Sequence, residues 1–145
     1  MKPALPKVEY EGVHCELVIE RPAPGVALMV LRGTDAGEFG DFPMRELAKD
    51  LAQFPLVDLF IDARAVRSAS VQVSAEWALW MRAHRTRFNQ ICMLTGSRYI
   101  QVTADFVRRF SELMDRMKLF TESEAFDANL EAAIVYRRNS AATTA

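Results

Sequence analysis

Polar side chains that could do chemistry follow three apolar segments that we predict to be neighbouring parallel strands. Because the carboxyl ends of parallel strands meet at one edge of a sheet, we expect these side chains to converge there. Hydroxyls beside arginines can bind an anion, or can carry a phosphate that arginine stabilises. Thr34 and Asp35 follow the first segment. The predicted binding surface itself consists of Asp62, Arg64, Arg67, Ser68, Ser70, Ser97 and Arg98.

The same serines also suit a purely structural role. Serine favours turns and helix N-caps, where its hydroxyl accepts a hydrogen bond from a backbone N–H group. For any single serine of this surface, capping remains the alternative to binding.

The histidines do not indicate a catalytic site. Nucleophilic catalysis needs a serine or cysteine within hydrogen-bond reach of a base that a third group orients. The chain has two histidines. His84 shares a helical stripe with Trp77, Trp80 and Phe88, which predicts a packing role, and His14 precedes an edge strand. We therefore expect no catalytic residue and a protein that is not an enzyme.

Metal and cofactor signatures are absent from the sequence as well. Glu122 and Glu124 stand at a helix start, where capping explains them better than metal binding. Gly33 and Gly37 lack the lysine or third glycine of a phosphate-binding loop. We expect no metal and no cofactor.

The composition is that of one soluble globular domain. Half of the 145 residues are hydrophobic, about a quarter are charged, and the net charge is −1.

Cys15 and Cys92 lie far apart in apolar surroundings, which predicts buried, reduced thiols and a cytoplasmic location. No apolar run approaches the roughly 20 residues of a membrane span. The aromatic residues lie at helical core spacing, so we expect neither membrane nor nucleic acid as a partner.

Apolar periodicity predicts strands and helices in alternation. Turn residues separate an edge strand from an apolar run that is typical of a strand buried on both faces. Thr103 and Thr121 are the expected caps of the last two helices, and Phe106, Phe110 and Met114 are expected in the core. The predicted strands are 15–20, 26–31, 56–64, 91–95 and 118–120, and the predicted helices start near residues 41, 74, 103 and 121.

This order predicts an α/β fold with a single mixed, mostly parallel sheet of five strands, an edge strand followed by four β-α units. Right-handed crossovers place the helices mainly on one face. We expect an N-terminal arm over 1–13, the α/β domain over 14–138 and a flexible tail over 139–145. Because residues 26–31 are apolar on both sides, the second face also needs a cover. The arm, a displaced helix or a second copy of the chain would provide it, and the last option implies a homodimer.

Arginines are concentrated between residues 77 and 110, where Asp105 is the only acidic residue. Such a patch could bind an acidic partner. Alternatively it is a solvated face with local ion pairs, because Asp105 and Arg109 have the favourable helix spacing of four. The arginines are Arg82, Arg85, Arg87, Arg98, Arg108 and Arg109.

The layout and the run Leu59-Phe60-Ile61-Asp62-Ala63-Arg64-Ala65-Val66 resemble the STAS domain, the fold of the anti-sigma factor antagonists. The resemblance covers residues 15–136. The run Trp77-Ala78-Leu79-Trp80-Met81-Arg82-Ala83-His84 also resembles a helix of a divergent branch of these domains. The resemblance implies a bacterial regulatory domain without catalysis. It would bind a kinase, a sigma-regulating protein or its own copies, sometimes under the control of serine phosphorylation.

The sequence departs from that family at the segment that family members phosphorylate. Switchable members open their second helix with an Asp-Ser-Ser-Gly element, and counting from Asp62 places the phosphoacceptor position on Gln72, which cannot accept phosphate. Ser70 and Ser74 flank this position and are the remaining phosphoacceptor candidates. Binding that does not depend on phosphate becomes the favoured mode.

Two other families share the expected layout. A response-regulator receiver would use Asp62 as its phosphoacceptor, and it also needs an acidic pair after its first core strand and a lysine at the end of its last strand. Here Asp35 is a single acidic residue after its strand, and Lys118 precedes its strand. Lipid carriers of the CRAL-TRIO kind would hold a small apolar ligand under the helices, although the chain is short for an enclosed cavity of several hundred Å3.

Overall fold

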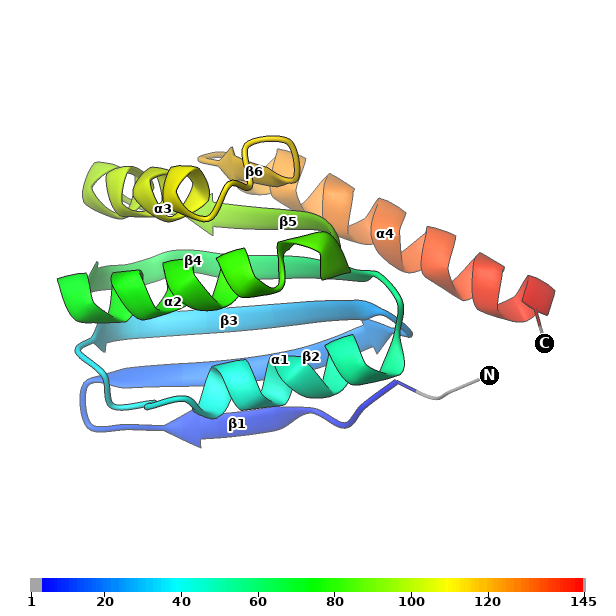
Figure 1. Ribbon diagram of the computed structural model, residues 1–145, viewed down its shortest axis with the longest axis horizontal. Helices are drawn as coiled ribbons and strands as arrows, with labels where there is room; N and C mark the ends of the chain where they lie inside the picture. Colours follow the sequence, from blue (N-terminus) through cyan, green and yellow to red (C-terminus); the bar gives the residue numbers. More distant parts are fainter. Residues whose placement is uncertain (1–3, 145) are drawn as a thin grey trace.

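The computed structural model describes residues 4–144, which form one sheet of six strands in chain order (Figure 1). The strands are β1 (Val8–Glu11), β2 (Cys15–Ala23), β3 (Val26–Asp35), β4 (Val57–Ala69), β5 (Phe88–Thr95) and β6 (Met117–Phe120). β1, β2 and β3 pair antiparallel, whereas β3 to β6 pair parallel. The predicted mixed, mostly parallel sheet is confirmed, with six strands in place of five.

The additional strand lies within the predicted N-terminal arm. β1 pairs with β2 in the register Val8 to Ile19, so β1 is the edge and β2, predicted as the edge, is interior. Half-buried Val8 and Tyr10 alternate with exposed Glu9 and Glu11, the period of two that a half-buried strand requires. Residues 1–3 of the arm lie outside the described residues.

The helices are α1 (Phe42–Gln53), α2 (Val71–Ala83), α3 (Arg98–Phe110) and α4 (Ser123–Thr144), with a 3-10 turn at Arg85–Arg87. α1, α2 and α3 cover one face of the sheet (Figure 1). They connect β3, β4, β5 and β6, which are added in order along one direction, so right-handed crossovers bring all of them to the same face. The prediction of helices mainly on one face is confirmed.

α4 covers the second face, so the displaced helix is the right one among the three covers considered. Its Phe126 and Ala133 are buried against Val26, Phe60 and Cys92 of the sheet. The predicted tail over 139–145 differs from the structure, because α4 continues to Thr144, and residue 145 lies outside the described residues.

A buried ion pair fastens α4 to the sheet. The Asp58 side chain on β4 is 3% exposed, and its Oδ2 accepts a hydrogen bond from Nε of Arg137 at 2.8 Å. Asn89 Nδ2 donates to the other carboxylate oxygen at 2.7 Å. Gly25, with φ +83°, lies under the guanidinium, where a Cβ atom would stand 2.6 Å from a nitrogen of Arg137. The positive φ favours glycine there, and a larger residue would also displace the Arg137 guanidinium.

The unit from β4 to α2 differs in its boundaries from the expectation. β4 was predicted to end near residue 64 and a polar loop to reach residue 74, but the strand continues to Ala69. The reason is that the end of β3 pairs with it, with Thr34 opposite Ser68 and Asp35 opposite Ala69. The predicted loop was therefore wrong for Arg67 and Ser68, which lie on β4, whereas Ser70 does lie between the strand and α2.

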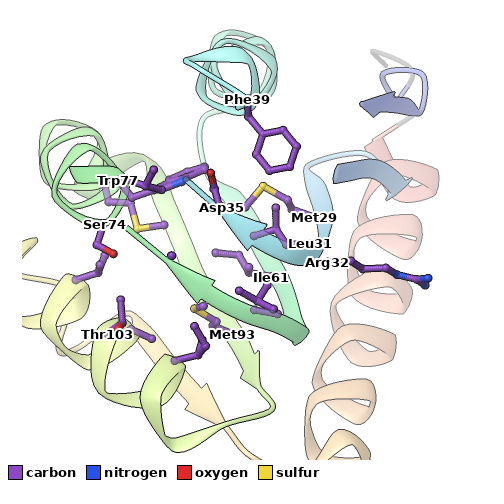
Figure 2. Close-up of a pocket in the computed structure, with 18 of the residues that line it drawn as sticks. Met29, Leu31, Arg32, Asp35, Phe39, Ile61, Ser74, Trp77, Met93 and Thr103 are labelled. Carbon is purple, nitrogen blue, oxygen red and sulfur yellow. The ribbon is translucent and has the colours of Figure 1, made fainter. Parts of the chain in front are cut away.

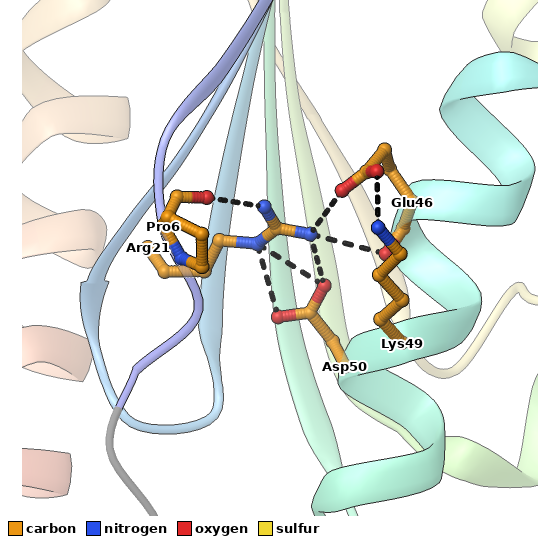
Figure 3. Close-up of polar contacts among 5 residues, drawn as sticks. All are labelled: Pro6, Arg21, Glu46, Lys49 and Asp50. Atoms are coloured by element: carbon orange, nitrogen blue, oxygen red, sulfur yellow. Dashed lines mark hydrogen bonds and ion pairs between the residues drawn. The ribbon is translucent and has the colours of Figure 1, made fainter.

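A second buried cluster joins β2, α1 and the N-terminal segment (Figure 3). The Arg21 side chain is 1% exposed, and its Nη2 atom lies 2.9 Å from Asp50 Oδ2 and 3.3 Å from Glu46 Oε2. Its Nη1 atom donates to the Pro6 carbonyl oxygen at 2.8 Å. Burial raises the pKa of the Asp50 carboxyl, although the hydrogen bonds and charge of Arg21 oppose this. The guanidinium thus satisfies groups from three segments at once.

We expect Arg21→Met to lower the free energy of unfolding by about 3–5 kcal/mol, because it leaves buried carboxylates without their partner. Arg45→Met is the matched control, since the Arg45–Asp41 pair is exposed and should be worth less than about 0.5 kcal/mol. Urea denaturation measures both. Equal stability losses in the two variants would contradict a structural role for the cluster.

Candidate functional site

The structure divides the predicted binding surface between the two faces of the sheet. Asp62 and Arg64 follow Phe60 at alternate positions of β4 and lie on the α4 side. Nη2 of Arg64 lies 2.8 Å from Asp62 Oδ2, and this hydrogen bond and charge raise the pKa of Arg64. Asp127 on α4 acts in the same direction. The Asp62 carboxylate is therefore already engaged by a neighbouring cation.

Ser70 and Ser74 lie at the start of α2, where β4 ends. Ser70 is the N-cap of α2: its Oγ accepts a hydrogen bond from the Val73 N–H group at 3.1 Å. Ser74 is 8% exposed, and its hydroxyl donates to the Ser70 carbonyl oxygen at 3.1 Å. Ser68 contacts Thr34 through their hydroxyls at 3.5 Å. The capping interpretation is thus confirmed for Ser70.

Ser97 also caps a helix, since its Oγ accepts from the Ile100 N–H group of α3 at 3.2 Å. α3 therefore starts at Arg98 and not at Thr103, whose hydroxyl bonds the Tyr99 carbonyl within the helix. Gly96 packs on the backbone of β4, where a Cβ atom would lie 2.1 Å from the Arg64 carbonyl oxygen.

The predicted convergence of the loops is only partial. β5 ends at Thr95, opposite Ala63, whereas β4 continues to Ala69 before Ser70 begins the next helix. Ser97 therefore lies at the level of Arg64 on β4, and Ser70 lies further along the strand. Arg67 and Arg98 are exposed. A single compact site that contains all the predicted residues does not form.

A cavity of about 90 Å3 lies between the sheet and helices α2 and α3 (Figure 2). Its floor comes from β3, β4 and β5 through Met29, Leu31, Ile61 and Met93. Trp77, Ile100 and Val107 contribute from the helices. The apolar residues that line the cavity have the spacing of ordinary core residues. The apolar periodicity of the sequence therefore did not predict an unfilled space between the sheet and the helices.

Asp35, at the end of β3, is the one acidic residue that lines this cavity. Burial raises the pKa of its carboxyl, and the charges of Glu38 and Glu76 raise it further. The Gly37 N–H group donates to Asp35 Oδ1 at 3.0 Å and opposes this change. No lysine or arginine forms an ion pair with Asp35 within residues 4–144.

The outer surface of α2 and α3 carries exposed apolar side chains. On α3, Phe106 is 51% exposed and stacks on Phe110 with ring centroids 5.8 Å apart. Arg82 of α2 lies over the Phe110 ring of α3, 6.0 Å from its centroid, so the two helices contact each other at these residues. We define the α2–α3 apolar patch as Val71 and Leu79 of α2 with Tyr99, Val102, Phe106 and Phe110 of α3.

The prediction that Phe106, Phe110 and Met114 are core residues was wrong. Small residues take the inner side of α3 and the turn after it, so Ala104 and Ser111 are buried with Ile100 and Val107. The Ser111 hydroxyl donates to the Ala78 carbonyl oxygen of α2 at 3.0 Å, which requires a close approach of the helices. The larger rings therefore lie on the flank of α3.

The basic segment forms local ion pairs, as the spacing of Asp105 and Arg109 indicated. Arg108 and Arg109 both bond the Asp105 carboxylate, and these hydrogen bonds lower the pKa of that group. Arg82 and Arg85 lie 3.5 and 3.6 Å from the Glu112 carboxylate. Arg87 instead donates to backbone carbonyls after α1.

The histidines and cysteines take structural positions. The Nδ1 atom of His84 lies 2.8 Å from the Trp80 carbonyl oxygen, and the two rings pack with centroids 4.6 Å apart. Cys15 and Cys92 are buried and free, as predicted, and burial raises the pKa of each thiol to about 11. The described residues contain no group of three or more metal-binding side chains and no helix suited to span a membrane.

Two solved structures share this fold. An uncharacterised DUF3478-family protein from Shewanella loihica, which has a SpoIIAA-like fold, superposes with a TM-score of 0.57 at 15% identity over 83% of this chain and 98% of its own. The anti-sigma factor antagonist SpoIIAA in its unphosphorylated form gives 0.51 at 16% identity over 77% of this chain and 94% of its own. No family model and no curated protein sequence matches the chain. The chain therefore has a STAS-like fold, as the sequence resemblance implied.

We expect Ser70→Ala to lower the free energy of unfolding by about 1 kcal/mol, because the cap of α2 is lost. Ser70→Asp should stay within a few tenths of a kcal/mol of the original chain, because aspartate is also a good N-cap. Urea denaturation of both variants is the measurement. A fully stable Ser70→Ala variant would show that the cap is dispensable.

Proposed function

We propose that this chain is a non-catalytic regulatory domain that binds a protein partner through the α2–α3 apolar patch. The observation that carries the proposal is the set of apolar side chains that these two helices leave exposed. Four of them share one face of α3 by their spacing: Tyr99, Val102, Phe106 and Phe110. The STAS-like fold adds support, because SpoIIAA itself is an anti-sigma factor antagonist. A bacterial signalling role and a cytoplasmic location belong to the same proposal, with a kinase or a sigma-regulating protein as the expected partner.

The composition of the patch suits a protein interface. Aromatic residues and arginine are enriched at the centres of such interfaces, and contiguous exposed apolar surface marks interaction sites. Tyr99, Phe106 and Phe110 supply the rings, and Arg82 stands beside them. The Arg82–Glu112 and Arg85–Glu112 pairs are long and exposed, so each contributes little to stability. Both arginines could therefore pair with acidic groups of a partner at small cost.

A phosphorylation switch, if it operates, is better placed on Ser70 than on Ser74. The Ser74 hydroxyl is buried and bonded to the turn before it, so a kinase would have to unwind the first turn of α2. Ser70 is half-buried and stands at the helix N-terminus, which favours negative charge. Gln72, at the family's phosphoacceptor position, bonds Glu76 on the surface of α2.

The alternatives from the sequence have less support. A receiver needs an Asp62 carboxylate that is free to accept phosphate, but Arg64 holds it on the α4 side. A lipid carrier needs an enclosed space of several hundred Å3, and the cavity under α2 and α3 measures about 90 Å3.

Phe106→Ser should abolish capture of a host protein in an affinity pull-down, because the ring is expected at the centre of the interface. Tyr136→Ser is the matched control, since Tyr136 is an exposed aromatic residue on α4, 69% accessible and outside the patch. Sedimentation of the purified chain shows whether a second copy is the partner. Identical capture by both variants would contradict the assignment of the patch.

Incubation with a host kinase fraction should add one phosphate to the chain, measured as intact mass. Ser70→Ala should remove that phosphate, and Ser74→Ala should leave it. An unmodified original chain, or a phosphate that persists in Ser70→Ala, would contradict a switch at Ser70.

A further inference from the structure

The cavity under α2 and α3 is an unfilled space in an otherwise packed layer. Protein interiors contain few voids larger than a water molecule, so a space of about 90 Å3 calls for an explanation. An engineered apolar cavity of about 150 Å3 binds a single benzene ring. The space here is smaller, about 90 Å3, and open at its rim, so it suits a short alkyl chain as it stands and a single ring only if its walls adjust.

The walls of the cavity are accessible and adaptable. Leu31, Trp77 and Met93 lie between the sheet and the helices, yet each remains half-buried and not fully buried. Four methionines, Met29, Met81, Met93 and Met117, contribute to the lining. Methionine side chains are flexible and polarisable, so they can adjust to the shape of an apolar guest.

The polar groups of the lining decide which end group a guest can carry. Asp35 is acidic, and Ser74 and Thr103 offer hydroxyls (Figure 2). The Arg32 side chain points away from the cavity and is exposed. Glu38 and Glu76 add negative charge close to Asp35, which is why they raise the pKa of its carboxyl. Arg32 is the basic residue of the lining, but neither it nor any other cation forms an ion pair with Asp35 among the described residues, so the unpaired charge at the Asp35 end of the cavity is negative.

We propose that this cavity binds a small amphipathic amine, with its apolar body between the sheet and helices α2 and α3 and its ammonium group at the Asp35 carboxylate. A hydrogen bond from an ammonium to a carboxylate is charge-assisted and stronger than one between neutral groups. A ligand with a carboxylate would instead meet Asp35, Glu38 and Glu76 as like charges. The cavity thus selects against short fatty acids. This site is independent of the proposed partner surface, because it uses the inner sides of the two helices.

Three probes that share a phenethyl body and differ in the end group test the assignment: phenethylamine, phenethyl alcohol and hydrocinnamate. They are titrated into the purified chain by calorimetry, with intrinsic tryptophan fluorescence as a second readout. We expect the amine to bind about tenfold more tightly than the alcohol, the ratio that a single charge-assisted hydrogen bond supplies. The carboxylate should bind most weakly.

Asp35→Asn should remove the preference for the amine and leave the affinity for the alcohol unchanged, because asparagine can still accept the Gly37 hydrogen bond. Asp41→Asn is the control of equal charge change, since Asp41 is exposed and paired with Arg45 outside the cavity. Ala104→Leu fills the space from α3, and Ala69→Leu does so from the half-buried end of β4 should the first variant fail to fold. A filled variant should lose all three probes.

The proposal is overturned if the folded original chain binds none of the probes at millimolar concentration. It is also overturned if the amine keeps its preference in Asp35→Asn, or if a folded filled variant binds as the original chain does. Loss of partner capture in Phe106→Ser has no bearing on these outcomes, so the two proposals fail separately.

Discussion

The parallel part of this sheet is apolar on both faces, and the rest of the structure follows from the need to cover both. Strands added in chain order bring α1, α2 and α3 to one face. With this strand order and right-handed crossovers, a helix that follows the last strand can reach the other face. α4 follows β6 and covers that face, with Phe126 and Ala133 buried against the sheet. The buried Asp58–Arg137 pair fixes where α4 lies, because an unpaired Asp58 would be costly at that depth.

Helices α2 and α3 carry both proposed surfaces for one physical reason. Small residues at their contact, Ala78 and Ser111, let the helices approach each other closely. Large rings such as Phe106 then have no place between the helices and remain on the outer side. On the inner side, the same two helices do not fill the space above β4 and β5.

The sequence predicted the fold class and the alternation of strands and helices, and it gave capping as the alternative role of the serines, because these depend on local periodicity and capping chemistry. It did not predict β1, whose two apolar residues, Val8 and Tyr10, are too few to show a period. It placed Ser68 in a loop because polar residues dominate there, whereas pairing with the end of β3 extends β4 to Ala69. The cavity and the exposure of Phe106 depend on distances between layers, which no single segment encodes.

Site-specific photocrosslinking in the native host tests the central claim most directly. A photoreactive phenylalanine analogue at position 106 lies in the α2–α3 apolar patch, and the same analogue at position 136 lies on α4 as a control. Our account predicts one discrete crosslinked protein from position 106 and none from position 136. The absence of a product at position 106, or the same product from both positions, would contradict a partner surface on α2 and α3.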